Sequence, residues 1–211
     1  LANGKTLSIV VVDKVAVGLI GIFDSVRETS KKTIMELKKL GIETAMITGD
    51  NKKTAEAVGA LLGIDRVFAE VLPEDKASFV KKLQGEGKFV AMVGDGVNDA
   101  PALAQSDIGI AIGAGTDVAI ETGNIVLMRS DPYDIVAAIR LSKATVRKMK
   151  QNLIWAATYN TLAIPIAAGL LYPSFGISIR PEWAALLMSG DSVAVAINAV
   201  LLKRIEPELK V

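Results

Sequence analysis

The chain has 211 residues, with 24 Lys and Arg against 23 Asp and Glu, no His and no Cys, and a formal net charge of +1. Because 51% of the residues are apolar and the mean hydropathy is +0.40, the composition excludes an intrinsically disordered chain. The absence of Cys and His excludes a disulfide scaffold and a Cys/His zinc site, and with no basic excess nothing indicates nucleic-acid binding.

The segment 1–23 is predicted to contain a β hairpin. Two apolar, β-branched runs, Leu7–Val12 and Val15–Ile22, are joined at Asp13 and Lys14. Such runs around a two-residue polar connection are typical of antiparallel strand pairs. The hairpin is either an edge element of the domain that follows or the end of a preceding domain.

Residues 24–142 alternate between apolar runs of strand length and segments of helical period. In chain order we expect a helix over 29–40, a strand over 42–47, a helix over 52–62, a strand over 67–69, a helix over 73–84, and strands over 89–93, 108–112 and 125–128. Asn51 is expected to cap the second helix and Pro73 to open the third. This alternation predicts an α/β fold with a Rossmann-like parallel sheet covered by helices. Because the strand over 89–93 is nearly all apolar, we expect it to be buried on both faces.

Two of the predicted strands end in similar polar sequences. The strand over 42–47 runs into TGDN at residues 48–51, and the strand over 89–93 runs into GDGVNDAP at residues 94–101. Since ligands bind beyond the carboxyl ends of parallel strands, we expect both sequences to lie at one site. A single Gly-Asp pair is usually only a turn, but folding alone does not require the longer sequence.

These residues suit a magnesium ion and a phosphate group. Asp95, Asn98 and Asp99 offer hard oxygen ligands in a short turn, which Mg²⁺ prefers. Thr48 offers a hydroxyl and a backbone N–H to a phosphate, and Lys76, near a helix start, offers a point charge. Together these groups are typical of phosphoryl transfer. Taken alone, Lys76 would be interpreted as a solvated surface lysine.

The C-terminal tail is apolar, since residues 153–202 carry only three charged side chains. The segment 153–172 has no charge, and the segment 183–202 has only Asp191. At about 1.5 Å per residue each segment spans roughly 30 Å, the thickness of a bilayer core. The pair predicts two antiparallel transmembrane helices joined by the loop 173–182. A buried helical hairpin in a soluble protein is the alternative.

Basic residues flank this pair of segments. A predicted basic linker helix over 143–152 precedes the first segment, and Lys203 and Arg204 begin the tail 203–211. Because positive flanks favour the cytoplasmic side, the loop 173–182 is expected outside and the α/β domain in the cytoplasm. We therefore expect an integral protein of the cell membrane, in contact with lipid.

The motifs and their order resemble the phosphorylation domain of P-type cation-transporting ATPases, which belongs to the haloacid dehalogenase superfamily. The resemblance rests on TGDN, GDGVNDAPAL, LPEDKASFVKKLQ and SDIGIAIGAGTDVAIETGNIVLM. It implies a haloacid dehalogenase-type fold for residues 24–142 and makes residues 1–23 the end of a nucleotide-binding domain. It further implies Mg²⁺ and ATP as cofactors.

The resemblance also implies a role for each polar residue at the strand ends. Asp95 would bind Mg²⁺ directly, with Asp99 and Asn98 completing and orienting its ligands. Thr48 and Lys76 would hold the phosphoryl oxygens. Asp50 would join the nucleotide hinge, and Gly49 would lie beside it at the cofactor-binding site.

The tail resembles the last two membrane helices of heavy-metal pumps, whose copper branch carries Tyr-Asn in one and Met-x-x-Ser-Ser in the other. Here these are Tyr159 and Asn160, then Met188 and Ser192, with Asp191 in place of the first Ser. The Met188 thioether suits Cu⁺, whereas Asp191 suits a divalent ion such as Cu²⁺ or Zn²⁺. The resemblance implies that all five face the ion path, although polar residues there also serve as interhelical hydrogen-bonding groups.

By this resemblance the chain is the C-terminal portion of a longer export pump. Its partners would be the actuator domain, the nucleotide-binding domain, the remaining membrane helices and a metallochaperone. The family's phosphorylated aspartate sits in DKTGT, which is absent here, so the chain alone is expected to be inactive.

Two alternatives remain from the sequence. One is a membrane-anchored phosphatase that uses Asp13 as nucleophile, although Asp13-Lys14 continues as Val-Ala-Val, which favours a hairpin turn. The other is a non-catalytic fragment that binds Mg²⁺ or nucleotide. The sequence leaves open the transported ion, the direction of transport and the oligomeric state.

Overall fold

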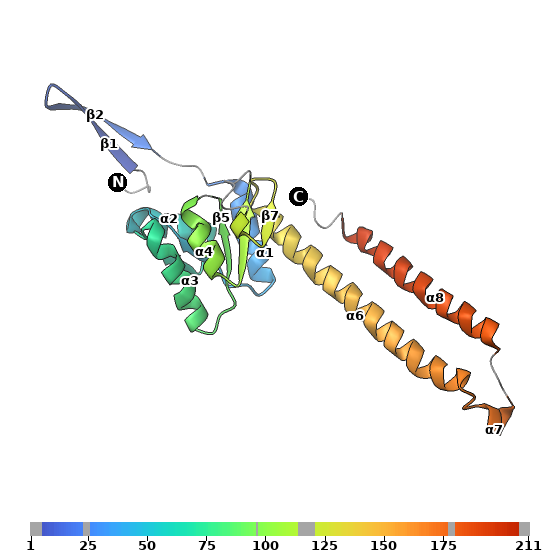
Figure 1. The fold of residues 1–211 in the computed structure, drawn as a ribbon. Coiled ribbons are helices and arrows are strands. Elements are labelled where there is room, and N and C mark those ends of the chain that lie inside the picture. The colour runs from blue at the N-terminus through green and yellow to red at the C-terminus, as the bar shows by residue number, and fades with distance from the viewer. Residues whose placement is uncertain (1–5, 23–25, 96, 114–120, 177–179, 207–211) are drawn as a thin grey trace. The chain divides into compact units, whose positions relative to one another are not determined.

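A computed structural model describes residues 6–22, 26–95, 97–113, 121–176 and 180–206 (Figure 1). The chain forms two compact units, residues 1–136 and 137–211. Within these described ranges, the first unit contains the strands and the second is helical.

The N-terminal hairpin is present as predicted. Strands β1 (Thr6–Val12) and β2 (Val15–Ile22) pair antiparallel, with a register shift between Val10 and Val11. The connection has positive φ at both residues, 50° at Asp13 and 64° at Lys14, which is the conformation of a tight hairpin turn.

The α/β fold is confirmed, but its parallel strands form two sheets where the sequence predicted one. Strand β3 (Ala45–Ile47) pairs with β4 (Arg66–Phe68). Strands β5 (Ala91–Gly94), β6 (Ile108–Ile112) and β7 (Ile125–Leu127) form the second sheet in that order. Among the described residues β3 pairs with β4 and β5 pairs with β6, so β3 and β5 each have one edge without a strand partner.

The three predicted helices begin and end close to the expected positions: α1 (Glu28–Lys39), α2 (Lys52–Leu62), and the 3₁₀ turn η1 (Pro73–Asp75) followed by α3 (Lys76–Gly85). The structure adds η2 (Val97–Asp99) and α4 (Ala100–Gln105), which were not predicted. Asn51 caps α2 by accepting the Thr54 N–H at 3.0 Å. Gly63 ends α2 with φ of 75°, a left-handed conformation that favours glycine.

The core lies between α4 and the second sheet. Leu103 and Ala111 are fully buried, with Met92 and Val126 packed against them. In the first sheet Gly59 lets α2 approach β4 directly, because a Cβ there would lie 2.5 Å from Val67.

The expectation that the segment 89–93 is buried on both faces is wrong. Phe89 is 75% exposed, Ala91 is exposed, and Met92 and Val93 are half-buried. The physical reason is the open edge of β5, because nothing in the described residues bonds to it on the side away from β6.

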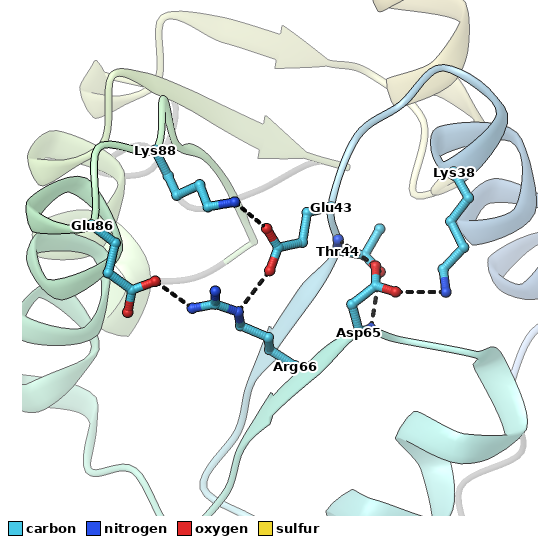
Figure 2. Close-up of polar contacts among 7 residues, drawn as sticks. All are labelled: Lys38, Glu43, Thr44, Asp65, Arg66, Glu86 and Lys88. Atoms are coloured by element: carbon cyan, nitrogen blue, oxygen red, sulfur yellow. Dashed lines mark hydrogen bonds and ion pairs between the residues drawn. The ribbon is translucent and has the colours of Figure 1, made fainter.

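A carboxylate ties the starts of β3 and β4 together (Figure 2). Asp65 accepts hydrogen bonds from the Thr44 N–H at 2.9 Å and the Thr44 hydroxyl at 2.8 Å. It also forms an ion pair with Lys38 at 2.7 Å. The Lys38 ammonium, followed by the Thr44 bonds, lowers the pKa of Asp65 from 3.8 to about 2.

Beside it, Arg66 and Lys88 bridge segments from both sheets (Figure 2). The Arg66 guanidinium contacts Glu43 and Glu86 at 2.6 Å each, and Lys88 contacts the other Glu43 oxygen at 2.6 Å. Since Glu43 precedes β3 and Lys88 precedes β5, this pair links the segments that lead into the two open edges.

The second unit consists of helices. Helix α6 (Tyr133–Ala167) starts in the first unit, where Tyr133 and Val136 are buried. After it come α7 (Tyr172–Phe175), α8 (Pro181–Val200) and the 3₁₀ helix η3 (Leu201–Ile205).

The helical span expected over 153–172 differs from the structure, because α6 ends at Ala167 and Gly169 has φ of 92°. Within the described residues, no helix combines the length and the apolar character needed to cross a bilayer. Parts of the expected loop 173–182 and tail 203–211 lie outside those residues.

We predict that replacing Asp65 by Asn destabilises the first unit in a pH-dependent way. A carboxyl with a lowered folded-state pKa stabilises the fold above its ordinary value of 3.8, and that gain is lost as the pH falls towards 2. Urea unfolding at several pH values should therefore show a difference between parent and Asp65→Asn that shrinks below about pH 4. A difference that stays constant down to pH 2 would contradict this account.

Candidate functional site

The TGDN sequence forms a loop held against the segment that follows β4. The Thr48 N–H donates to the Phe68 carbonyl at 2.9 Å, and the Val71 N–H donates to the Thr48 carbonyl at 3.0 Å. Within the loop, the Thr48 hydroxyl donates to the Asp50 carboxylate at 2.9 Å and accepts the Asp50 N–H at 3.1 Å. Gly49 and Asp50 are exposed, so this loop faces solvent at the carboxyl end of β3.

A lysine and a carboxylate meet at the carboxyl end of β5. The Lys76 ammonium lies 2.7 Å from Asp99 Oδ1, and their side chains are 19% and 11% exposed. The Asp95 N–H points at the other Asp99 oxygen at 3.4 Å. The structure thus brings Lys76 to the Asp95–Asp99 turn, although Lys76 and Asp99 are 23 residues apart in the sequence. Asn98 lies exposed in η2, within that turn.

Gly94 makes this arrangement possible. A Cβ at position 94 would lie 2.5 Å from the Asp99 Cβ and 2.9 Å from one of its carboxylate oxygens. Only a residue without a side chain leaves room for the Asp99 carboxylate at the end of β5.

The donor set fits a magnesium ion. Mg²⁺ in phosphoryl-transfer sites usually takes one or two protein carboxylates and completes its octahedron with water and phosphate oxygens. Asp95 and Asp99 supply two carboxylates four residues apart, and Asp95 is exposed to an incoming ligand. In the described part of the chain, no cluster of three or more acidic, His or Cys side chains forms a cage for a metal.

Glu70 is a residue of this site that the sequence did not reveal. It adopts a positive φ of 57°, its N–H donates to the Asp50 carbonyl at 2.9 Å, and its carboxylate accepts the Lys52 N–H at 3.3 Å. It therefore holds both ends of the turn between Asp50 and α2. A left-handed conformation is rare for Glu, and no sequence pattern signals it.

The remaining predicted residues lie elsewhere. Asp13 occupies the hairpin turn between β1 and β2. Tyr159 and Asn160 lie in α6, half-buried and exposed respectively, and Ser192 lies exposed in α8. Met188 and Asp191 belong to α8, and their side chains lie outside what the structure describes.

A family model for haloacid dehalogenase-like hydrolases matches residues 2–107. The chain belongs to the haloacid dehalogenase-like hydrolases. The membership agrees with the parallel strands and with polar loops at their carboxyl ends, and it confirms the family predicted from the motifs.

The relatives of this hydrolase domain are metal-pumping ATPases. The chain is 52% identical over 208 residues to a probable copper-exporting P-type ATPase of Archaeoglobus fulgidus and 55% identical over 202 residues to copper-exporting P-type ATPase B of the same organism. These matches cover 99% and 95% of the chain, but only 26% and 29% of the relatives. The chain thus spans little more than a quarter of their length.

Solved structures that resemble this chain are also heavy-metal ATPases. A zinc-transporting PIB-type ATPase in its E2.Pi state matches with a TM-score of 0.78 at 36% identity, over 95% of this chain and 32% of that one. The similarity to heavy-metal P-type ATPases therefore extends to the fold.

We predict that Gly94→Ala destabilises the hydrolase domain by about 1–3 kcal/mol, because the new Cβ overlaps Asp99. Urea unfolding measures the change. On an Asp99→Gly background the same substitution should cost much less, since the overlapping atoms are gone. Equal costs on both backgrounds would show that the contact with Asp99 is not the cause.

Proposed function

We propose that the chain supplies the phosphorylation-site portion of an ATP-driven heavy-metal export pump of the copper type. The observation that carries the proposal is the Lys76–Asp99 pair beside Asp95, at the carboxyl end of a parallel strand in a haloacid dehalogenase-like domain. The copper-exporting relatives, matched over at least 95% of the chain, support the choice of cargo.

In this proposal Asp95 binds Mg²⁺, while Asp99 and Asn98 complete and orient its ligands. Mg²⁺ would draw charge from the transferred phosphoryl group. Lys76 is held in place by Asp99, and it has ammonium protons left to donate to a phosphoryl oxygen.

The TGDN loop has a separate task. Thr48 directs its hydroxyl towards Asp50, and a phosphoryl oxygen replaces that acceptor when it binds. Gly49 gives the backbone a close approach, and Asp50 joins the nucleotide hinge. The chemistry is positioning and charge stabilisation, as in other phosphoryl transfers.

The phosphorylated aspartate is proposed to come from polypeptide outside this chain. DKTGT is absent from the sequence, and Asp13 lies in a hairpin turn. The open edges of β3 and β5 support this proposal, because a strand entering there would place an aspartate between the TGDN loop and Asp95.

We predict that the 211-residue chain alone does not hydrolyse ATP, whereas the pump that contains it does so in response to Cu⁺. In that pump Thr48→Ala and Lys76→Met should each lower kcat by about a hundredfold, because each removes a donor to the transferred group. Phosphate release during steady turnover is the measurement, and Lys81→Met, a lysine on α3 outside the site, is the control. Hydrolysis by the isolated chain that disappears in Asp13→Asn would favour the phosphatase alternative instead.

We also propose that the second unit belongs to the membrane part of the pump. Its support is the apolar sequence over 153–172 and 183–202, the basic flanks and the match to pumps across nearly the whole chain. Tyr159, Asn160 and Ser192 would face the ion path together with Met188 and Asp191. Copper is the proposed cargo, with zinc or another heavy-metal ion as the alternative that Asp191 favours. A metallochaperone would deliver the ion.

We predict that cysteines introduced one at a time report this topology. Because the chain has no Cys of its own, only the introduced residue can be labelled. In cells, Ser174→Cys in α7 should react with a membrane-impermeant maleimide added outside. Ser142→Cys near the start of α6 should react only after permeabilisation. Labelling of both from outside, or of neither, would contradict the proposed hairpin.

A further inference from the structure

Helices α6 and α8 run side by side (Figure 1), and the pocket between them is not used by the proposed pump chemistry. Gln151, Asn152 and Trp155 line it from α6, and Ala194 and Asn198 line it from α8, around a volume of about 250 Å³. A cavity needs only about 10–15 Å³ of such volume to hold one water, so this pocket has room for a small solute.

A lysine fixes the orientation of the amides in this pocket. The Lys148 ammonium lies 2.7 Å from Asn198 Oδ1, and Asn198 Nδ2 lies 2.6 Å from Asn152 Oδ1. Because an ammonium only donates, the Asn198 atom that faces it must be oxygen. Asn198 then turns its NH₂ towards Asn152, which must accept. The chain of bonds runs in one direction, from Lys148 through Asn198 to Asn152.

This direction leaves the pocket rich in donors. The side-chain oxygens of Asn198 and Asn152 each accept one of these bonds. The Asn152 NH₂ and the remaining protons of Lys148, which contacts Asn198 beside the five lining residues, can donate further bonds. No Asp or Glu is among the five lining residues, and Arg147 and Lys150 flank Lys148 in the sequence. The pocket therefore suits an anion with several acceptor oxygens, and the charge of Lys148 disfavours a cation.

We propose that this pocket binds a phosphate-type oxyanion, carried either by a phospholipid headgroup or by a free phosphate. Lys148 would supply the charge and Asn152 the amide donors, and charge-assisted hydrogen bonds of this kind are the strong ones. Trp155, 55% exposed, adds an apolar wall on which the rest of a headgroup would lie. Basic pockets between helices near a membrane surface recognise anionic headgroups in this way. The inference does not depend on the proposed ATPase activity.

The test uses Trp155 as the reporter. The chain has two Trp residues, so in the full-length Trp183→Phe chain all indole fluorescence comes from the pocket. Its emission is followed while inorganic phosphate is added, and separately while vesicles of phosphatidylcholine, with or without phosphatidylglycerol, are added. A saturable change with phosphate identifies a free-phosphate site. A saturable change only with phosphatidylglycerol vesicles identifies a headgroup site.

Matched variants test whether binding in the pocket causes the fluorescence change. Lys148→Gln keeps a donor towards Asn198 but removes the charge, and it should weaken binding at least about tenfold, as expected for a charge-assisted bond. Asn152→Leu should also weaken binding without any change of charge. Lys143→Gln, which loses the same charge on the same helix outside the pocket, should bind as the parent does. Circular dichroism verifies that each variant keeps its helices.

Three results would overturn the proposal. The first is no saturable change with phosphate or with either vesicle. The second is an equal loss in Lys148→Gln and Lys143→Gln, which would indicate unspecific attraction to a basic surface. The third is an equal response to vesicles with and without phosphatidylglycerol when phosphate alone gives no saturable change, because binding would then not depend on an anionic headgroup. None of these readouts involves ATP turnover, so failure here is distinct from failure of the proposed pump function.

Discussion

The carboxylate of Asp99 lies where water hardly reaches it, and a buried charge is tolerated only with a partner. Lys76 is that partner, and the pair joins the first turn of α3 to the loop after β5. Position 94 requires glycine, because the Asp99 side chain occupies the space that a Cβ there would fill. The site thus depends on one ion pair, which holds a cation and a carboxylate at one strand end before any ligand arrives.

A second set of charges acts at the opposite ends of the strands. Asp65 fixes β3 to β4 through Thr44, and Glu43 connects the approaches to β3 and β5 through Lys88 (Figure 2). The Lys88 hydrogen bond to Glu43 lowers the pKa of that carboxyl, so Glu43 stays ionised at more acidic pH than an ordinary glutamate. The amino ends of the strands are fixed by charge, so the loops at the carboxyl ends are left for ligands.

Local signals explain why most elements could be predicted from the sequence. Asn51, Gly63 and Pro73 mark helix ends by conformational and capping preferences that act within a few residues, and the structure places the boundaries there. Residue types and motifs also indicated Lys76, Asp95 and Asp99 as residues of one site. The direct ion pair between Lys76 and Asp99 was not predicted, because it forms only through the tertiary fold. The left-handed Glu70 gave no signal, and the exposure of Phe89 depends on strand pairing that hydrophobicity does not specify.

The open edges of β3 and β5 also bear on the solubility of the isolated chain. An unpaired strand edge offers its backbone groups to any other strand, and apolar side chains close by favour such pairing. Phe89 and Leu72 are 75% and 57% exposed in the segments next to β5 and β4. Among the described residues, unpaired edges on both sheets allow end-to-end growth as well as dimers. Self-association of the isolated chain should therefore rise steeply with concentration.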